Sequence, residues 1–164
     1  MGGGRMELMN LIPSSAGWMQ AGLVISSALL QEMACHAARC FPLEACGILG
    51  GRDNRAEVVI PIPNTSPDPF RFRMDPQNQV DSFFSLEKIG LKLLAIYHSH
   101  PHGPDCLSAT DLAEAHYLTS AHILWYTQDE KWKYRAFRVN GDKTEEISIY
   151  IEHEWQRLSA MRVK

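Results

Sequence analysis

Two histidines lie two residues apart in the segment Tyr97-His-Ser-His-Pro101, directly after the apolar run Leu91–Tyr97. The apolar run is typical of a buried strand, which is expected to bring His98 to the surface. In a strand, side chains at positions i and i+2 point to the same face, so both imidazoles can bind one metal ion. Pro101 is expected to end the strand directly after His100.

A carboxylate follows at the start of the next predicted helix. After a turn through Gly103-Pro104, Ser108 can cap a helix that has Asp111 in its first turn, and this carboxylate can point back toward the histidines. Two imidazoles and one carboxylate are a ligand set of catalytic zinc sites, in which the fourth position is left for water. On its own, however, Ser108-Ala-Thr-Asp111 is an ordinary helix start that resembles a capping box.

A candidate general base lies at the start of an earlier predicted strand, in Pro42-Leu-Glu-Ala-Cys46. Water activated by zinc reacts faster when a nearby base takes its proton, and Glu44 could supply that base. An isolated glutamate before a strand is usually a solvated loop residue. Sequence spacing alone does not place Glu44 beside the histidines.

Taken together, these residues resemble the JAMM motif of the MPN+ metalloproteases, and the spacing matches the family pattern at each signature position. The matching residues are Glu44, His98-Ser99-His100-Pro101, Ser108 and Asp111. The resemblance covers about residues 23–151. It implies that His98, His100 and Asp111 bind zinc, that Glu44 is the general base and later the proton donor, and that Ser108 stabilises the tetrahedral oxyanion.

The same resemblance implies a zinc-dependent peptidase or isopeptidase. The chain lacks the insertions usual in eukaryotic members that cut ubiquitin chains, so it resembles the stand-alone bacterial and archaeal branch. That branch implies a partner that is a ubiquitin-like or sulfur-carrier protein with a Gly-Gly tail, from which an amino acid or protein adduct is removed. Two alternatives stay open: a non-catalytic MPN interaction scaffold, although such relatives typically lose a ligand, and a zinc hydrolase of a small amide substrate.

Further polar residues near the motif, His102, Asp105 and Cys106, are expected to line the cleft. A Cys106 thiolate would be a good zinc ligand, but this position is variable in the family. The segments 64–75 and 102–107 are expected to border a narrow channel in which the Gly-Gly tail pairs with a strand edge.

Sequence signatures of other hydrolase classes are absent. The sequence has no His-Glu-x-x-His of helical zincins and no Gly-x-Ser-x-Gly of serine hydrolases. It also lacks the Pro-Cys-x-x-Cys of nucleotide deaminases, whose fold is related in its layering.

The remaining sequence predicts the elements that position these residues. Ser26 or Ser27 can cap a helix whose apolar positions follow the helical period and which Pro42 stops; these positions are Leu30, Met33, Ala34 and Ala37. Asp75-Pro76 predicts the start of a second helix that runs to Gly90, with Val80, Phe83 and Phe84 facing the core. Strands are expected near residues 23–25, 45–50, 57–61, 91–97, 122–127, 133–139 and 146–151, and the second and third of these form a hairpin.

Interleaved helices and strands predict an α/β fold: a single three-layer domain with a mixed β-sheet flanked by helices. This arrangement is compatible with the fold of the MPN family. The domain is expected to span residues 22–152, after a flexible N-terminal extension, 1–21, and before a C-terminal tail, 153–164.

Composition limits the classes of partner. The 164 residues allow about one domain. The 16 Lys and Arg against 19 Asp and Glu give a net charge of −3 without a basic stripe, so a nucleic-acid partner is not expected. No apolar run is long enough for a membrane helix and the start does not resemble a signal peptide, so the protein is expected to be cytoplasmic, with its four cysteines reduced.

Overall fold

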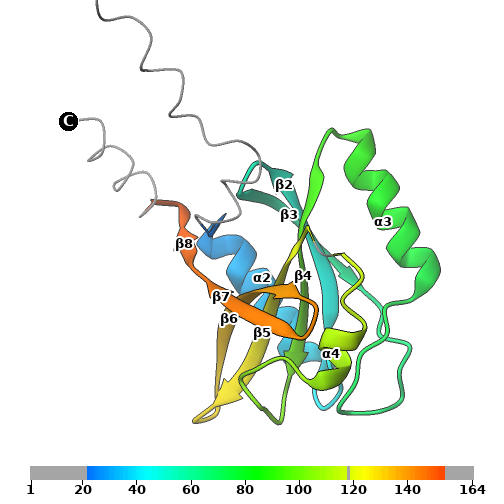
Figure 1. Cartoon of the computed structure of the whole chain (residues 1–164), viewed down its shortest axis with the longest axis vertical. Coiled ribbons are helices and arrows are strands. Elements are labelled where there is room, and N and C mark those ends of the chain that lie inside the picture. Colours follow the sequence, from blue (N-terminus) through cyan, green and yellow to red (C-terminus); the bar gives the residue numbers. More distant parts are fainter. Residues whose placement is uncertain (1–21, 118, 154–164) are drawn as a thin grey trace, which may run out of the picture.

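One mixed sheet of eight strands runs through the part of the chain that the computed structural model describes, residues 22–117 and 119–153 (Figure 1). The strands are β1 (Leu23–Ile25), β2 (Cys46–Arg52), β3 (Arg55–Ile62), β4 (Lys92–His100), β5 (Ala121–Gln128), β6 (Lys131–Asn140), β7 (Lys143–Ile147) and β8 (Ile149–Ile151). Their order in the sheet is β7-β6-β5-β4-β2-β3-β1-β8. Strand β4 pairs in parallel with β5 and antiparallel with β2, which confirms the mixed sheet.

Helices cover both faces of this sheet, which confirms the three layers. Helix α2 (Ser27–Cys40) packs Leu30, Met33 and Ala37 against one face. Helices α3 (Pro76–Lys88) and α4 (Ala109–Ala113) pack against the other, and Figure 1 shows α2 and α3 on opposite sides of the strands. Among the helices of the described residues, none has the length and apolar character needed to cross a membrane.

Several predicted element boundaries are confirmed by the capping contacts. The Ser26 hydroxyl accepts a hydrogen bond from the backbone N–H of Leu29 at 3.2 Å and begins α2. The Asp75 carboxylate accepts one from the N–H of Asn78 at 2.9 Å, and Pro76 is the first residue of α3. The predicted hairpin is the antiparallel pair β2–β3.

The buried face predicted for α3 is correct for Phe83 but wrong for Val80 and Phe84. Phe83 is half-buried and packs against the core and the Tyr117 ring, while Val80 and Phe84 are exposed; the fully buried residues are Ser82 and Leu86. Residues four apart share a helix face, so Ser82 lies with Leu86, and Val80 lies with Phe84 on a different face. Burial of Ser82 is possible because its hydroxyl donates a hydrogen bond to the carbonyl of Asn78 at 2.6 Å.

The single strand predicted over residues 146–151 is also wrong. It is divided at Ser148 into β7, which pairs with β6 at one edge of the sheet, and β8, which pairs with β1 at the other. The backbone N–H of Leu23 donates to the Ser148 carbonyl at 2.9 Å, so the two edges approach each other here. Alternating isoleucines predict which face is buried, but they do not predict the neighbouring strand.

Gly47 lies where β2, which pairs with the histidine strand β4, passes close to its neighbours. A Cβ atom there would come within 2.5 Å of the Tyr97 ring and 2.6 Å of the Ile60 carbonyl oxygen. We expect Gly47→Ala to lower the free energy of unfolding by about 3 kcal/mol, measured by urea denaturation. Gly141→Ala, where nothing lies within 4 Å but φ is +65°, should cost about 1 kcal/mol. Equal losses in the two variants would contradict the close packing at Gly47.

Candidate metal centre

Strand β4 presents His98 and His100 on one face, with Ile96, toward the layer formed by α3 and α4. It continues through His100: the pairing with β2 extends to His98, which lies opposite Cys46, and the pairing with β5 extends to His100, which lies opposite Tyr126. Both imidazoles are therefore buried. The expectation that Pro101 ends the strand directly after His100 is confirmed, whereas the expectation that the strand brings His98 to the surface is wrong.

The structure brings four of the five predicted site residues together. The Nε2 atoms of His98 and His100 lie 3.2 Å apart. The Oδ2 atom of Asp111 lies 3.5 Å from the first and 3.4 Å from the second. On the other side, Oε1 of Glu44 lies 3.7 Å from Nε2 of His100.

This spacing fits a metal ion. Ligand atoms that lie 2.0–2.2 Å from a tetrahedral zinc ion are about 3.3–3.6 Å from one another, and the three nitrogen and oxygen atoms of His98, His100 and Asp111 are 3.2–3.5 Å apart. Glu44, His98 and His100 also place one ligand atom each within 4.8 Å of one another. Two carboxylates can thus approach an ion held by the histidines, and Asp111 is the better ligand because it lies close to both imidazoles.

The position of Glu44 is fixed through its backbone and the next residue. The N–H of Ala45 donates to the Ser99 hydroxyl at 2.8 Å, and the N–H of Ser99 donates to the Ala45 carbonyl at 3.0 Å. The Asn64 side-chain amide donates to the Glu44 carbonyl at 3.0 Å. These bonds attach the start of β2 to the histidine strand and to the loop after β3.

Glu44 is buried and, among the described residues, its Oε2 atom has no hydrogen-bond partner. Burial raises the pKa of the Glu44 carboxyl to about 8, and the charge of His100 opposes this only in part. A carboxyl group with a pKa near neutral can take up and release a proton at physiological pH.

Ser108 and Asp111 form a capping box and contribute to the cluster at the same time. The Ser108 N–H donates to Oδ2 of Asp111 at 2.6 Å, and the Asp111 N–H donates to Oγ of Ser108 at 3.1 Å. Burial alone would raise the pKa of Asp111, but its interactions with the imidazoles of His100 and His98 outweigh it and hold this pKa well below its usual range. The Ser108 hydroxyl accepts the backbone bond and retains its own proton for donation.

Two contacts orient the imidazoles. Nδ1 of His100 lies 2.9 Å from the Pro104 carbonyl, which fixes the tautomer with the proton on Nδ1 and leaves Nε2 free to bind a metal. The Phe72 ring stacks on His98, with ring centroids 4.5 Å apart. Neither contact was predicted from the sequence, nor were those of Ser99 and Asn64; only the expected border segment 64–75 includes Phe72 and Asn64.

A family model described as "Prokaryotic homologs of the JAB domain" matches residues 26–140. The chain belongs to this family. The sequence resemblance to the JAMM group is thereby confirmed.

Curated relatives of this JAB-family protein are peptidases by name. This chain is 43% identical over 94 residues to the "Probable TtuB-protein conjugate cleaving protease" of Thermus thermophilus, and the match covers 57% of this chain and 63% of that protein. It is 34% identical over 134 residues to the "CysO-cysteine peptidase" of Mycobacterium tuberculosis, covering 79% and 92%. A crystal structure of a JAB1/MPN domain protein from Archaeoglobus fulgidus shares the fold, with a TM-score of 0.55 and 22% identity over 79% of this chain and 98% of that one.

The three residues predicted to line the cleft of this JAB-family protein are all exposed. His102 contacts the rings of Phe41 and Phe70 at the rim of the metal centre. The Asp105 carboxylate instead pairs with Arg135, at 3.1 Å. Cys106 is a free thiol.

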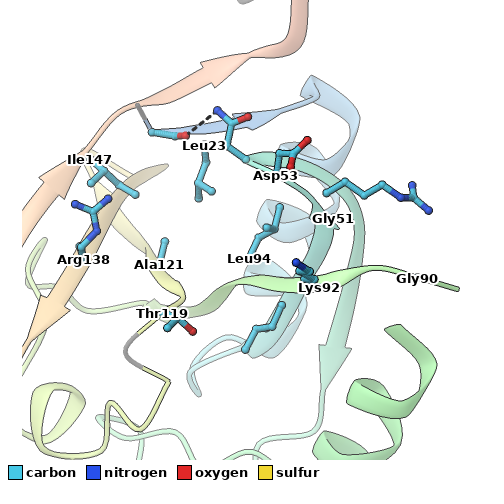
Figure 2. Close-up of a pocket in the computed structure, with 14 residues that line it drawn as sticks. Leu23, Gly51, Asp53, Gly90, Lys92, Leu94, Thr119, Ala121, Arg138 and Ile147 are labelled. Atoms are coloured by element: carbon cyan, nitrogen blue, oxygen red, sulfur yellow. Dashed lines mark hydrogen bonds between the residues drawn. The ribbon is translucent and has the colours of Figure 1, made fainter. Parts of the chain in front are cut away.

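A separate cavity of about 650 Å³ lies at the opposite end of the sheet (Figure 2). It is lined by the β2–β3 turn and by the starts of β4 and β5, including Asp53, Lys92 and Ala121, and by Arg138 of β6. None of the five predicted site residues lies in it. The candidate metal centre therefore lies at the end of β4 that carries His98 and His100, and the cavity lies at the other end of this strand.

Ser99 is expected to be a positioning residue of the JAB-family site. Its replacement by alanine leaves the buried N–H of Ala45 without its partner, which should cost about 1–3 kcal/mol of unfolding free energy. Because Ala45 follows Glu44, kcat should fall as well. Ser85→Ala, which removes an exposed hydroxyl bonded to the Asp81 carbonyl in α3, should change neither quantity appreciably. A Ser99→Ala variant with normal stability and kcat would show that this bond does not position Glu44.

Proposed function

We propose that this protein is a zinc-dependent peptidase or isopeptidase that cleaves the bond following the Gly-Gly tail of a ubiquitin-like or sulfur-carrier protein. The observation that carries the proposal is the convergence of His98, His100 and Asp111 within 3.5 Å of one another, with Glu44 beside them. This combination of a three-ligand site and an adjacent carboxylate is typical of a metal-dependent hydrolase.

His98, His100 and Asp111 would hold the ion. When bound, zinc would supply Lewis acidity toward the scissile carbonyl and toward water. Glu44 takes a proton from the attacking water and later gives it to the leaving amine. The Ser108 hydroxyl donates a hydrogen bond to the carbonyl oxygen as negative charge develops on it.

The substrate class rests on the relatives. One is named for cleaving TtuB–protein conjugates and another for CysO–cysteine, so both remove a group from a carrier protein. A glycine tail offers few side-chain contacts, and main-chain pairing in a narrow channel is a suitable way to bind it. The loop after β3, which contains Asn64 and Phe72, borders the cluster and could form one wall of that channel.

The test uses TtuB and CysO, each with its tail extended by one amino acid and, separately, joined to a lysine of a folded protein. We expect zinc-dependent cleavage of at least one carrier, abolished by chelators, with kcat/KM reduced about tenfold or more when the penultimate glycine becomes leucine. Equal cleavage of the leucine variant would favour a hydrolase of broader or small amide substrates. Zinc binding without any cleavage would favour a scaffold.

We assign this chemistry to a domain over residues 22–152. The predicted extension, 1–21, and all but the first residue of the predicted tail, 153–164, lie outside the described residues. All four cysteines are free thiols, which supports a reducing location such as the cytoplasm. This location stays a prediction.

A further inference from the structure

Three exposed rings from separate segments meet beside the metal centre. Phe41 follows α2, Phe70 lies in the loop between β3 and α3, and His102 follows β4. The His102 ring lies 5.5 Å from that of Phe41 and 5.9 Å from that of Phe70, between centroids. The two phenylalanines are 57% and 69% exposed. Neighbouring apolar rings left in water at one place commonly mark an interaction surface.

The segments that hold these rings also hold the metal centre. Phe41 is three residues before Glu44, His102 is two residues after His100, and Phe70 is two residues before Phe72, which stacks on His98. The rings therefore form the rim of the site. A folded protein whose amine reaches the buried cluster must lie against this rim.

The loop holds Phe70 in its outward position through its own hydrogen bonds. The Phe70 N–H donates to the Asp68 carboxylate at 2.8 Å, and the Asp68 N–H donates to the Ser66 hydroxyl at 3.2 Å. The Asn64 side chain accepts from the N–H groups of Ser66 and Arg73, each at 2.9 Å. A surface ordered in advance loses less conformational entropy when it binds a partner.

The chemistry of the proposed function indicates which part of the substrate meets the rings. Glu44 gives its proton to the leaving amine, so the leaving group lies on the Glu44 side, whereas the carbonyl oxygen lies on the Ser108 side. Phe41 belongs to the same short connection as Glu44 and is thus on the side of the leaving group. A leaving group of one amino acid is short enough to lie within the buried site, whereas a folded protein as leaving group would extend over the rim.

We propose that Phe41, Phe70 and His102 form a docking surface for the folded protein whose lysine supplies the leaving amine. This inference rests on the proposed function and narrows its substrate class to conjugates of a carrier with another protein. The partner surface it fits is apolar and lies next to the modified lysine. Large rings contribute strongly to such contacts because they bury much area with few rotatable bonds.

The test compares two substrates of one carrier: TtuB joined to a lysine of a folded protein, and TtuB extended by a single cysteine. For Phe41→Ala/Phe70→Ala we expect kcat/KM on the conjugate to fall about tenfold or more, mainly through KM. Cleavage of the single-cysteine substrate should stay within about twofold of wild type, because its leaving group is one amino acid and does not extend to the rim. Phe41→Tyr should retain activity on the conjugate.

Ile89→Ala is the matched control. Ile89 is 57% exposed, as Phe41 is, but it precedes β4 and so lies at the other end of that strand from His100. It should leave both substrates unaffected. Equal loss on both substrates in the double variant, or no loss on the conjugate, would overturn the docking surface. A wild-type protein that cleaves neither these substrates nor the corresponding substrates of CysO would refute the proposed function itself, and this inference with it.

Discussion

Replacing Glu44 by glutamine is expected to lower kcat by about 10²–10⁴-fold, the usual cost of losing a general base. The amide has nearly the same size and still accepts a hydrogen bond, but it cannot take a proton from water. Glutamine is neutral, as is the protonated form of the buried carboxyl, so folding should be preserved. The measurement is steady-state hydrolysis of the carrier substrate, together with zinc content and the thermal midpoint of the variant.

The control for this variant is Glu57→Gln. Glu57 is a surface carboxylate that accepts two hydrogen bonds from Arg52, at 2.7 and 2.6 Å, in the hairpin β2–β3. An exposed ion pair contributes little to stability, and activity should stay within about twofold. If Glu44→Gln turned over substrate at nearly the wild-type rate while holding zinc, Glu44 would not be the base.

Replacing His98 by alanine should remove most metal binding and lower kcat/KM by at least about 10³-fold. Loss of groups that only orient ligands typically costs 10–100-fold, so loss of a ligand should cost more. The variant should bind less than one zinc per chain after reconstitution, measured by elemental analysis. Because the activity loss arises from the metal, high zinc concentration should restore part of it.

His122→Ala distinguishes this effect from general damage to the core. His122 is also buried and, on β5, lies opposite Ile96, which shares the face of His98. Burial lowers the pKa of His122 to about 4, so it is neutral at physiological pH as His98 is. The control should lose stability but keep its zinc. Equal loss of zinc in both variants would argue against a ligand role specific to His98.

Local patterns in the sequence predicted the parts of the site that depend on local structure. A period of two brought His98 and His100 to one face, and the offset of three residues between Ser108 and Asp111 gave the capping box that the structure contains. Pro76 and Ser26 likewise predicted helix starts that are confirmed. The shared strand face, the capping box and the helix starts each depend only on residues close together in the sequence.

Contacts between distant segments were beyond such patterns. Ala45 and Ser99 are 54 residues apart, and only the pairing of β2 with β4 brings Glu44 to the histidines. Resemblance to a family, rather than spacing, suggested that proximity. The stacking of Phe72 on His98 depends on how a loop packs against the sheet. The exposed face of α3 depends on how the helix packs, because apolar residues lie on more than one of its faces and periodicity alone does not show which face is buried.

The most direct test of the metal centre is an anomalous-scattering measurement at the zinc absorption edge, on crystals of the protein reconstituted with zinc. We predict one strong peak per chain, about 2.0–2.2 Å from Nε2 of His98, Nε2 of His100 and a carboxylate oxygen of Asp111. The absence of a peak, or a peak held by other residues, would contradict this prediction.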